Sequence, residues 1–268
     1  MTDSNANPSR SSGLPPVAEP SEPGRPCAIV TGSSAGLGLA TAKALLARGW
    51  IVLGVARREA PIEAADYHHL KADLAEPEVL NHALESLLRE PMLTRAARVG
   101  LVNNAAKLGP TGPLHRLEAA ELNAALTLNL TIPSLFAARF AAAAGKRPAR
   151  IVNISSGAAS SAYPGWGSYC LSKSALAMAG EVLAVELAET PELRGRDVAI
   201  LRYAPGVVDT DMQVEARSAE AADCPRVEKF VTLHREGRLV PPEAPAKEIA
   251  DFLDSDPVER LTTARYEG

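Results

Sequence analysis

The fold of this 268-residue chain is decided by one stretch, Thr31-Gly32-Ser33-Ser34-Ala35-Gly36-Leu37-Gly38. The stretch follows a short apolar run, residues 28–31, and precedes an Ala/Leu-rich segment, residues 38–48, so it joins a predicted strand to a predicted helix. Glycines in such a turn permit a tight bend and let the backbone approach a pyrophosphate at the helix N-terminus. A glycine-rich turn can also join a strand to a helix for purely steric reasons, so the motif needs support from the rest of the chain.

Short β-branched runs alternate with Ala/Leu-rich helical stretches along the chain. The expected strands span residues 28–31, 51–55, 68–72, 99–102, 150–154, 198–202 and 262–266. The expected helices span residues 38–48, 77–89, 119–144 and 168–189. A helix between successive strands implies right-handed crossovers, and nearly continuous apolar strands suit a sheet that is covered on both faces. We therefore expect an α/β fold: a single Rossmann-type, doubly wound, mostly parallel seven-stranded sheet with helices on both faces.

Two segments stand outside this alternation. Residues 1–25 carry several prolines among serines, glycines and acidic residues without hydrophobic periodicity, and they are expected to form a disordered tail. Residues 26–268 are expected to form one nucleotide-binding domain. Within it, residues 211–245 interrupt the strand–helix pattern, and we interpret them as a lid over the substrate.

Composition excludes several classes of function. The chain is 46% hydrophobic and 22% charged with a formal net charge of −4, so it has no basic surplus with which to bind nucleic acid. No window is expected to approach the roughly eighteen consecutive apolar residues of a membrane span. The three cysteines show no Cys-x-x-Cys spacing and would leave one unpaired in any disulfide scheme. We therefore expect a soluble, cytoplasmic protein that binds no nucleic acid, no membrane and no metal.

The end of the second strand bears on the choice of dinucleotide. An NAD-binding protein places a carboxylate here to hold the ribose 2′-hydroxyl, whereas this chain reads Val55-Ala56-Arg57-Arg58. Two guanidinium groups suit the 2′-phosphate of NADP, which they can hold by bidentate, charge-assisted bonds. Adjacent arginines in a loop can also be simply solvated. The missing acid nevertheless favours NADP(H) as the cofactor.

The strongest constellation is Ser156, Tyr169 thirteen residues later, and Lys173 one helical turn beyond it. A carbonyl that accepts a hydride develops alkoxide charge and needs a proton from a nearby acid. An ammonium about 4 Å from a phenol, at an effective dielectric of roughly 20, favours the phenolate by roughly 4 kcal/mol and would bring its pKa from about 10 to near 7. Ser156 can donate a hydrogen bond to the substrate oxygen. A lone Tyr-x-x-x-Lys is usually a helix-surface pair, but the preceding strand and Ser156 favour catalysis.

These motifs together resemble the short-chain dehydrogenases/reductases from Cys27 to the C-terminus. The resemblance also rests on Asp73-Leu74, Asn103-Asn104-Ala105-Ala106, Leu128-Asn129-Leu130 and Pro205-Gly206-x-x-x-Thr210. It implies that Asn129 holds a water in a proton relay through Lys173, and that residues 205–210 pack around the nicotinamide carboxamide. It also implies a homodimer or homotetramer that pairs through residues 119–144 and 168–189.

The resemblance assigns residues to two sets. The catalytic set is Asn129, Ser156, Tyr169 and Lys173. The set expected to bind the cofactor is Gly32, Ser33, Ser34, Ala35, Gly36, Leu37, Gly38, Arg57, Arg58, Asp73, Leu74, Asn103, Ala105, Tyr169, Lys173, Pro205, Gly206, Val208 and Thr210.

A finer resemblance concerns the expected substrate pocket. The stretches 165–170, 203–213 and 237–240 are similar to those of sepiapterin reductases and bacterial benzil reductases. The residues expected to contact substrate are Ser156, Trp166, Tyr169 and Met212. Trp166 and Met212 could also be plain packing residues. Two departures stand out: Ala35 replaces an arginine that touches the NADP phosphate, and Arg265 aligns with an aspartate that anchors the pterin.

We therefore expect an NADPH-dependent carbonyl reductase that acts on a ketone or a vicinal dicarbonyl, a small-molecule substrate. One alternative is an NAD-dependent dehydrogenase of hydroxy compounds, which the missing acid after Ala56 disfavours. The other is a non-catalytic NADP-sensing protein on the same fold, which would not need Tyr169 or Lys173.

Overall fold

The computed structural model describes residues 24–267, and these residues contain one seven-stranded sheet in the order β3-β2-β1-β4-β5-β6-β7. Every neighbouring pair of strands runs parallel, so the expected fold class is confirmed, with a wholly parallel sheet. The strands are β1 Cys27–Thr31, β2 Ile51–Ala56, β3 Tyr67–Lys71, β4 Val99–Asn103, β5 Ala149–Ile154, β6 Val198–Ala204 and β7 Leu261–Arg265. The chain winds outward from β1 to β3 and returns to the other side of β1 at β4. This reversal opens a crevice at the carboxyl ends of β1 and β4, where such sheets bind ligands.

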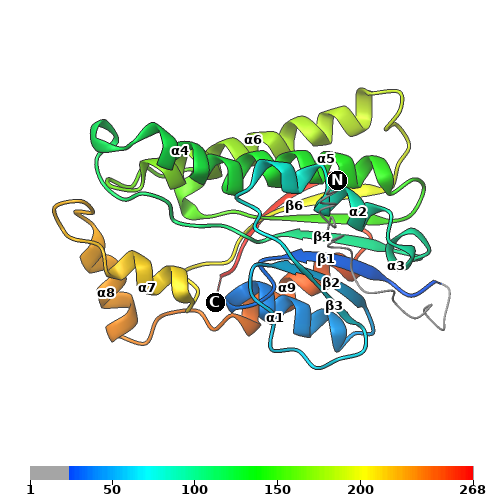
Figure 1. The fold of residues 1–268 in the computed structure, drawn as a ribbon, viewed down its shortest axis with the longest axis horizontal. Coiled ribbons are helices and arrows are strands. Elements are labelled where there is room, and N and C mark those ends of the chain that lie inside the picture. Colours follow the sequence, from blue (N-terminus) through cyan, green and yellow to red (C-terminus); the bar gives the residue numbers. More distant parts are fainter. Residues whose placement is uncertain (1–23, 268) are drawn as a thin grey trace, which may run out of the picture.

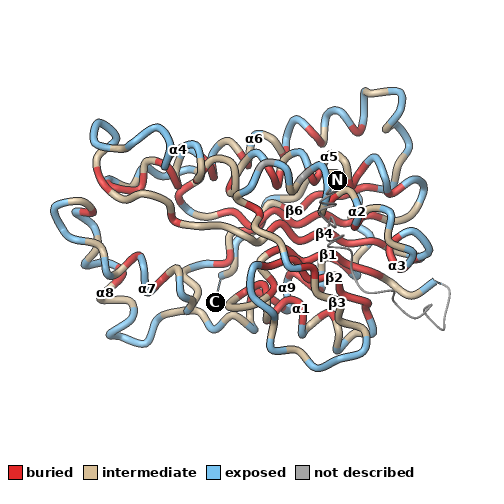
Figure 2. The backbone as a smooth tube through the Cα atoms, viewed as in Figure 1, coloured by how far each residue is buried: buried red, intermediate tan, exposed pale blue. Residues whose placement is uncertain are grey.

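Helices cover both faces of the sheet (Figure 1). The helices are α1 Gly36–Leu46, α2 Ala83–Leu88, α3 Pro91–Thr94, α4 Ala119–Leu126, α5 Ile132–Ala143, α6 Gly167–Glu189, α7 Asp211–Arg217, α8 Val227–Arg235 and α9 Glu243–Asp254. Helices α1 and α9 lie on one face, whereas α2 to α6 lie on the other (Figure 1). Successive residues of β1 point to opposite faces of the sheet. Ile29 packs in the cluster that includes residues of α5, and Val30 packs in the cluster that includes residues of α1. The strands are the most deeply buried part of the chain (Figure 2), because apolar side chains cover both faces.

The helix expected over residues 119–144 is interrupted. Its middle, Thr127–Thr131, is a π-helical turn between α4 and α5. Pro133 has no N–H to donate to the carbonyl of Asn129 four residues earlier, and the helix widens at this point. The helix expected over residues 77–89 divides into a 3₁₀ turn, Pro77–Leu80, and α2.

The expectation that no window approaches a membrane span was too strict. The helical run Ala119–Ala143 is long and apolar enough by length and composition to cross a membrane. In the fold, 44% of its most apolar window is buried, and Phe136 and Phe140 belong to the main core. The run therefore packs one face against the core of this domain.

The segment expected to be a lid, residues 211–245, holds α7 and α8, which project beyond the carboxyl end of the sheet (Figure 1). Its last residues already belong to α9, which the sequence interpretation missed. Helix α9 buries Ala246, Ile249, Ala250 and Leu253. The prolines near the start of α9 are typical of a loop, but proline is also compatible with the first turn of a helix.

The expected disordered tail, residues 1–25, lies largely outside the described residues. Arg25 belongs to the fold, since its guanidinium group pairs with Asp66 at 2.8 Å and donates to the carbonyl of Gly49 at 2.9 Å. These contacts join Arg25 to the loops before β2 and β3. The folded domain therefore includes Arg25.

Candidate active site

A cavity of about 340 Å³ lies at the carboxyl ends of the central strands. Its lining comes from the glycine-rich turn after β1, residues 104–106 after β4, residues 154–158 at the end of β5 and residues 204–208 at the end of β6, together with α6, α7 and α8. Segments that are far apart in the sequence therefore meet here because parallel strands present their carboxyl ends at one edge.

The glycine-rich turn forms a cradle at one end of the cavity. Gly32 has φ +69°, and a Cβ there would lie 2.8 Å from the Asn104 amide nitrogen. Gly36 has φ +51°, and a Cβ there would lie 2.8 Å from Cγ2 of Thr210. Helix α1 begins at Gly36 with no acidic residue in its first turn. The free N–H groups and positive dipole end of this helix suit a phosphate, so the cradle fits a dinucleotide.

Hydrogen bonds tie this turn to the loop after β4. The backbone N–H groups of Asn104 and Ala105 both donate to Oγ1 of Thr31 at 3.0 Å. The Asn104 side chain donates to the carbonyl of Thr31 at 2.9 Å. Asn103, which was expected to bind the cofactor, points into the core and donates to Asn153 at 2.9 Å. Of the two asparagines it is Asn104 that lines the cavity, and the contact of Asn103 with the cofactor remains a prediction.

Several expected cofactor residues support the cradle from behind. Ser33 is fully buried, with its Oγ 2.9 Å from the hydroxyl of Tyr67. Gly38 cannot be replaced without a clash, because a Cβ there would lie 2.2 Å from the Gly32 oxygen. Leu74 is a core residue, and Asp73 accepts a hydrogen bond from the N–H of Ala75 at 2.9 Å.

The expected cofactor set thus divides into two groups. Those that line the cavity are Gly32, Ala35, Gly36, Leu37, Ala105, Tyr169, Lys173, Pro205, Gly206, Val208 and Thr210. Those that do not line it are Ser33, Ser34, Gly38, Arg57, Arg58, Asp73, Leu74 and Asn103.

The two arginines after β2 are solvent-exposed. The side chain of Arg57 is 76% exposed, and its nearest recorded carboxylate, Asp73, lies 3.9 Å away. Arg58 is 74% exposed and lies 3.7 Å from a carboxylate oxygen of Asp211. Contacts this long between exposed groups are weak, so both guanidinium groups remain available to an anion.

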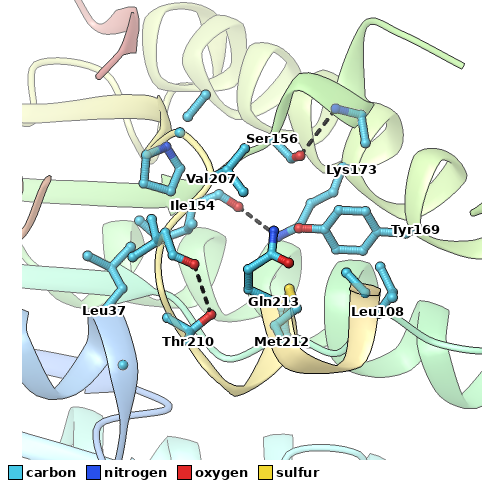
Figure 3. Close-up of a pocket in the computed structure, with 18 of the residues that line it drawn as sticks. Leu37, Leu108, Ile154, Ser156, Tyr169, Lys173, Val207, Thr210, Met212 and Gln213 are labelled. Atoms are coloured by element: carbon cyan, nitrogen blue, oxygen red, sulfur yellow. Dashed lines mark hydrogen bonds between the residues drawn. The ribbon is translucent and has the colours of Figure 1, made fainter. Parts of the chain in front are cut away.

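The structure brings three of the four expected catalytic side chains together, those of Ser156, Tyr169 and Lys173 (Figure 3). Tyr169 and Lys173 lie on α6 and are both buried. The Lys173 ammonium donates to the carbonyl of Ile154 at 2.7 Å and lies 5.6 Å from the centroid of the Tyr169 ring. Ser156 follows β5, and its Oγ accepts a hydrogen bond from the N–H of Ala158 at 3.2 Å.

Burial dominates the proton affinities of this cluster. It raises the pKa of Tyr169 to about 12, against the opposing effect of a hydrogen bond with Ser156. Burial also lowers the pKa of Lys173 to about 8. The expectation that Lys173 lowers the tyrosine pKa to near 7 is therefore wrong for this arrangement, because the sequence argument ignored the desolvation of both groups. At neutral pH the phenol holds its proton and Lys173 carries its charge.

Asn129 acts away from the cavity. It lies in the π-helical turn, and its side-chain oxygen accepts from the N–H of Lys107 at 3.0 Å. Its amide donates to the carbonyl of Lys107 at 2.8 Å and to Oγ of Ser172 at 3.3 Å. This buried asparagine clamps the loop after β4 to α6, which carries Tyr169, and it is therefore a positioning residue. The water relay remains an expectation.

An aromatic wall, Tyr163, Trp166 and Phe230, closes the substrate end of the cavity. The rings of Trp166 and Phe230 stack at 4.6 Å, and those of Tyr163 and Trp166 at 5.4 Å. The Lys229 ammonium lies 5.2 Å from the centroid of Tyr163 and donates to its hydroxyl at 3.2 Å. The expected substrate residues Trp166 and Met212 both line the cavity. The sequence interpretation missed Phe230, because only the tertiary fold brings α8 against Trp166.

Comparisons with known proteins agree with this arrangement. The family model described as short chain dehydrogenase matches residues 26–221. The chain is 31% identical over 237 residues to an (S)-benzoin-forming benzil reductase of Bacillus cereus, a match that covers 85% of this chain and 94% of the relative. It is 35% identical over 248 residues to sepiapterin reductase of Mus musculus, covering 85% and 91%.

A solved dehydrogenase structure from Beutenbergia cavernae, which holds NADP at low occupancy, is similar with a TM-score of 0.73 and 26% identity. The match covers 90% of this chain and 95% of that one. The family model spans the segments that carry the glycine cradle and the Ser156, Tyr169 and Lys173 cluster. This chain therefore belongs to the short-chain dehydrogenase family of oxidoreductases.

Proposed function

We propose that this protein is an NADPH-dependent carbonyl reductase that acts on a ketone or a vicinal dicarbonyl. The observation that carries the proposal is a single cavity in which Ser156, Tyr169 and Lys173 lie between the glycine cradle and the aromatic wall. A non-catalytic sensor would need the cradle but not a buried acid beside a buried lysine. A reductase would use both the glycine cradle, for the cofactor, and the aromatic wall, for the substrate.

The side chains have distinct tasks in this proposal. The nicotinamide cofactor, when bound, supplies the hydride. Ser156 already accepts a hydrogen bond from Ala158, so its own hydrogen is left to hold the substrate oxygen. Tyr169 keeps its proton at neutral pH and donates it to that oxygen as charge develops. Lys173, charged below a pKa of about 8, stabilises the phenolate that remains.

NADPH is the proposed cofactor because cations and no carboxylate directly follow β2. Arg57 and Arg58 are exposed and only weakly paired, so they can close on a 2′-phosphate. The cradle around Gly36 would hold the pyrophosphate at the N-terminus of α1. The bound NADP of the Beutenbergia cavernae relative supports the same choice.

The cavity favours an apolar dicarbonyl over a pterin. A pterin edge carries hydrogen-bond donors that need a buried acceptor, since each unmet donor costs about 1 to 3 kcal/mol. Arg265, at the end of β7, lines the cavity and can only donate. Glu267, the other candidate near the end of the chain for the pterin anchor, is not part of the lining. The aromatic wall would instead stack on an aryl ring.

The proposal is tested by measuring NADPH oxidation with benzil and with sepiapterin. We expect kcat/KM to be higher for benzil. We also expect Arg265→Asp to shift the ratio toward sepiapterin about tenfold, or about 1.4 kcal/mol in transition-state stabilisation. A tenfold wild-type preference for sepiapterin would contradict the substrate assignment. NADPH binding without turnover of any carbonyl compound would favour the sensor instead.

We also propose that two copies of the chain pair through α5 and α6. Helix α6 exposes Leu171, Met178, Val182 and Val185, which recur at helical spacing along one stripe, and α5 exposes Leu135. An exposed apolar stripe of this kind is typical of a helix that packs against a partner. We expect a dimer or tetramer by sedimentation, and a smaller species for Val182→Glu. Val258→Glu, a matched change at a fully exposed position, should leave the mass unchanged.

A cytoplasmic setting is proposed from the cysteines. Cys27, Cys170 and Cys224 are all free, and burial raises the pKa of the Cys27 thiol to about 12. An unreactive, buried thiol suits a reducing compartment. Beyond a small carbonyl substrate and further copies of this chain, we propose no partner.

A further inference from the structure

Gln213 is a buried polar side chain on the inward face of α7. It is 5% exposed and lines the cavity, while Ala216, one turn later on the same face, packs in the apolar cluster with Phe230. Its side-chain oxygen is buried and has no hydrogen-bond partner among the described residues. A buried amide without a partner is costly, and glutamine is normally exposed.

The fold gives no local reason for an amide at this position. The backbone N–H of Gln213 donates to the carbonyl of Thr210 at 2.9 Å, a bond that any residue except proline could make. An apolar side chain of similar length would fill the same space without the cost of an unpaired amide. Gln213 lines the same cavity as Ser156 and Tyr169, so a ligand in that cavity can provide a hydrogen-bond partner for its amide.

Figure 3 shows the Gln213 amide pointing into the part of the cavity that holds the Tyr169 hydroxyl and the Lys173 ammonium. No hydrogen bond among residues 24–267 fixes which end of the Gln213 amide faces the cavity, so the amide can turn to present either its oxygen or its NH₂ group. Ser156 and Tyr169 together account for one substrate oxygen. Gln213 is therefore a hydrogen-bonding group in excess of what a simple ketone needs.

We propose that Gln213 is a specificity residue whose NH₂ group donates to the second, non-reacting oxygen of a vicinal dicarbonyl. This inference rests on the proposed function. One carbonyl carbon receives the hydride of NADPH, and its oxygen receives the Tyr169 proton. The second carbonyl is unchanged, so the product is an α-hydroxy ketone. Gln213 fixes which carbonyl lies beside Tyr169, because the adjacent oxygen must lie within reach of the amide.

The test compares benzil with deoxybenzoin, in which a CH₂ group replaces one carbonyl between the same two rings. Both are assayed with wild type, Gln213→Met and Gln213→Leu at saturating NADPH. We expect the two variants to lose about five- to tenfold in kcat/KM for benzil and less than twofold for deoxybenzoin, as for an uncharged hydrogen bond. Each variant is compared with wild type on the same substrate, so the difference in electrophilicity between benzil and deoxybenzoin cancels when the two losses are compared.

Met212→Leu, a change at the neighbouring lining residue, is the matched control and should affect both substrates by the same factor. Fluorescence titration with NADPH shows whether each variant keeps its cofactor site. An equal loss for the two substrates, or no loss for either, would overturn the specificity role of Gln213. If wild type binds NADPH and reduces neither substrate, the proposed function fails first, and the inference about Gln213 fails with it.

Discussion

Tyr169→Phe is expected to lower kcat for carbonyl reduction by about 10²- to 10⁴-fold while NADPH binding stays largely intact. The change deletes the acid but keeps the ring, which packs edge-on against Trp166 at 6.1 Å. The buried hydroxyl holds its proton at neutral pH. Tyr169 lines the same cavity as Ser156, where the substrate oxygen must lie. Steady-state kinetics gives kcat, and fluorescence titration gives the NADPH dissociation constant.

Tyr203→Phe is the matched control for this variant. Tyr203 lies in β6, and its hydroxyl donates to Glu248 of α9 at 2.6 Å on the far side of the sheet from α6. Its loss should lower the free energy of unfolding by about 1.5 to 3 kcal/mol, as for a bond to a charged group, with little effect on kcat. A Tyr169→Phe enzyme that kept more than about a tenth of the wild-type kcat would show that Tyr169 is not the acid.

The fold could be predicted because its signals are local. Each strand of the sheet is a short apolar run, and all seven expected strands agree with the structure to within two residues at each end. The interruption at Asn129 was missed, because apolar residues continue through it at helical spacing and only Pro133 marks the change. Helix α9 was missed because the prolines at its start obscured the regular spacing of its buried residues.

The catalytic cluster could also be predicted, because its members follow fixed elements of the fold. The side-chain directions of Asn103 and Ser33 could not, since the sequence does not say which of two neighbouring polar residues faces the core. Gln213 and Phe230 depend on how α7 and α8 pack against Trp166. The pKa values of Tyr169 and Lys173 could not be predicted from the sequence either, because burial sets them and burial depends on the tertiary structure.

Arg57→Asp is expected to raise KM for NADPH about ten- to hundredfold, since losing a charged hydrogen bond costs about 1.5 to 3 kcal/mol. The KM for NADH should rise much less or even fall, because the new carboxylate can hold a ribose 2′-hydroxyl. The structure indicates that a change in KM would report cofactor binding rather than misfolding. Arg57 is 76% exposed, and its contact with Asp73 is 3.9 Å long, so its removal disturbs little of the fold.

The same reversal of charge at a remote position separates recognition from general electrostatic attraction. Arg89 is exposed at the end of α2, and its contact with Glu85 is equally long at 3.9 Å. Arg89→Asp changes the net charge by the same amount but should alter KM for NADPH and NADH alike and only slightly, because salt screens distant charges. Equal shifts of both KM values in Arg57→Asp would show that Arg57 does not read the phosphate. The double variant Arg57→Asp/Arg58→Asp tests whether both arginines bind the 2′-phosphate. A further rise in KM for NADPH, without a matching rise for NADH, would show that the two guanidinium groups share the phosphate, as their neighbouring positions after β2 predict.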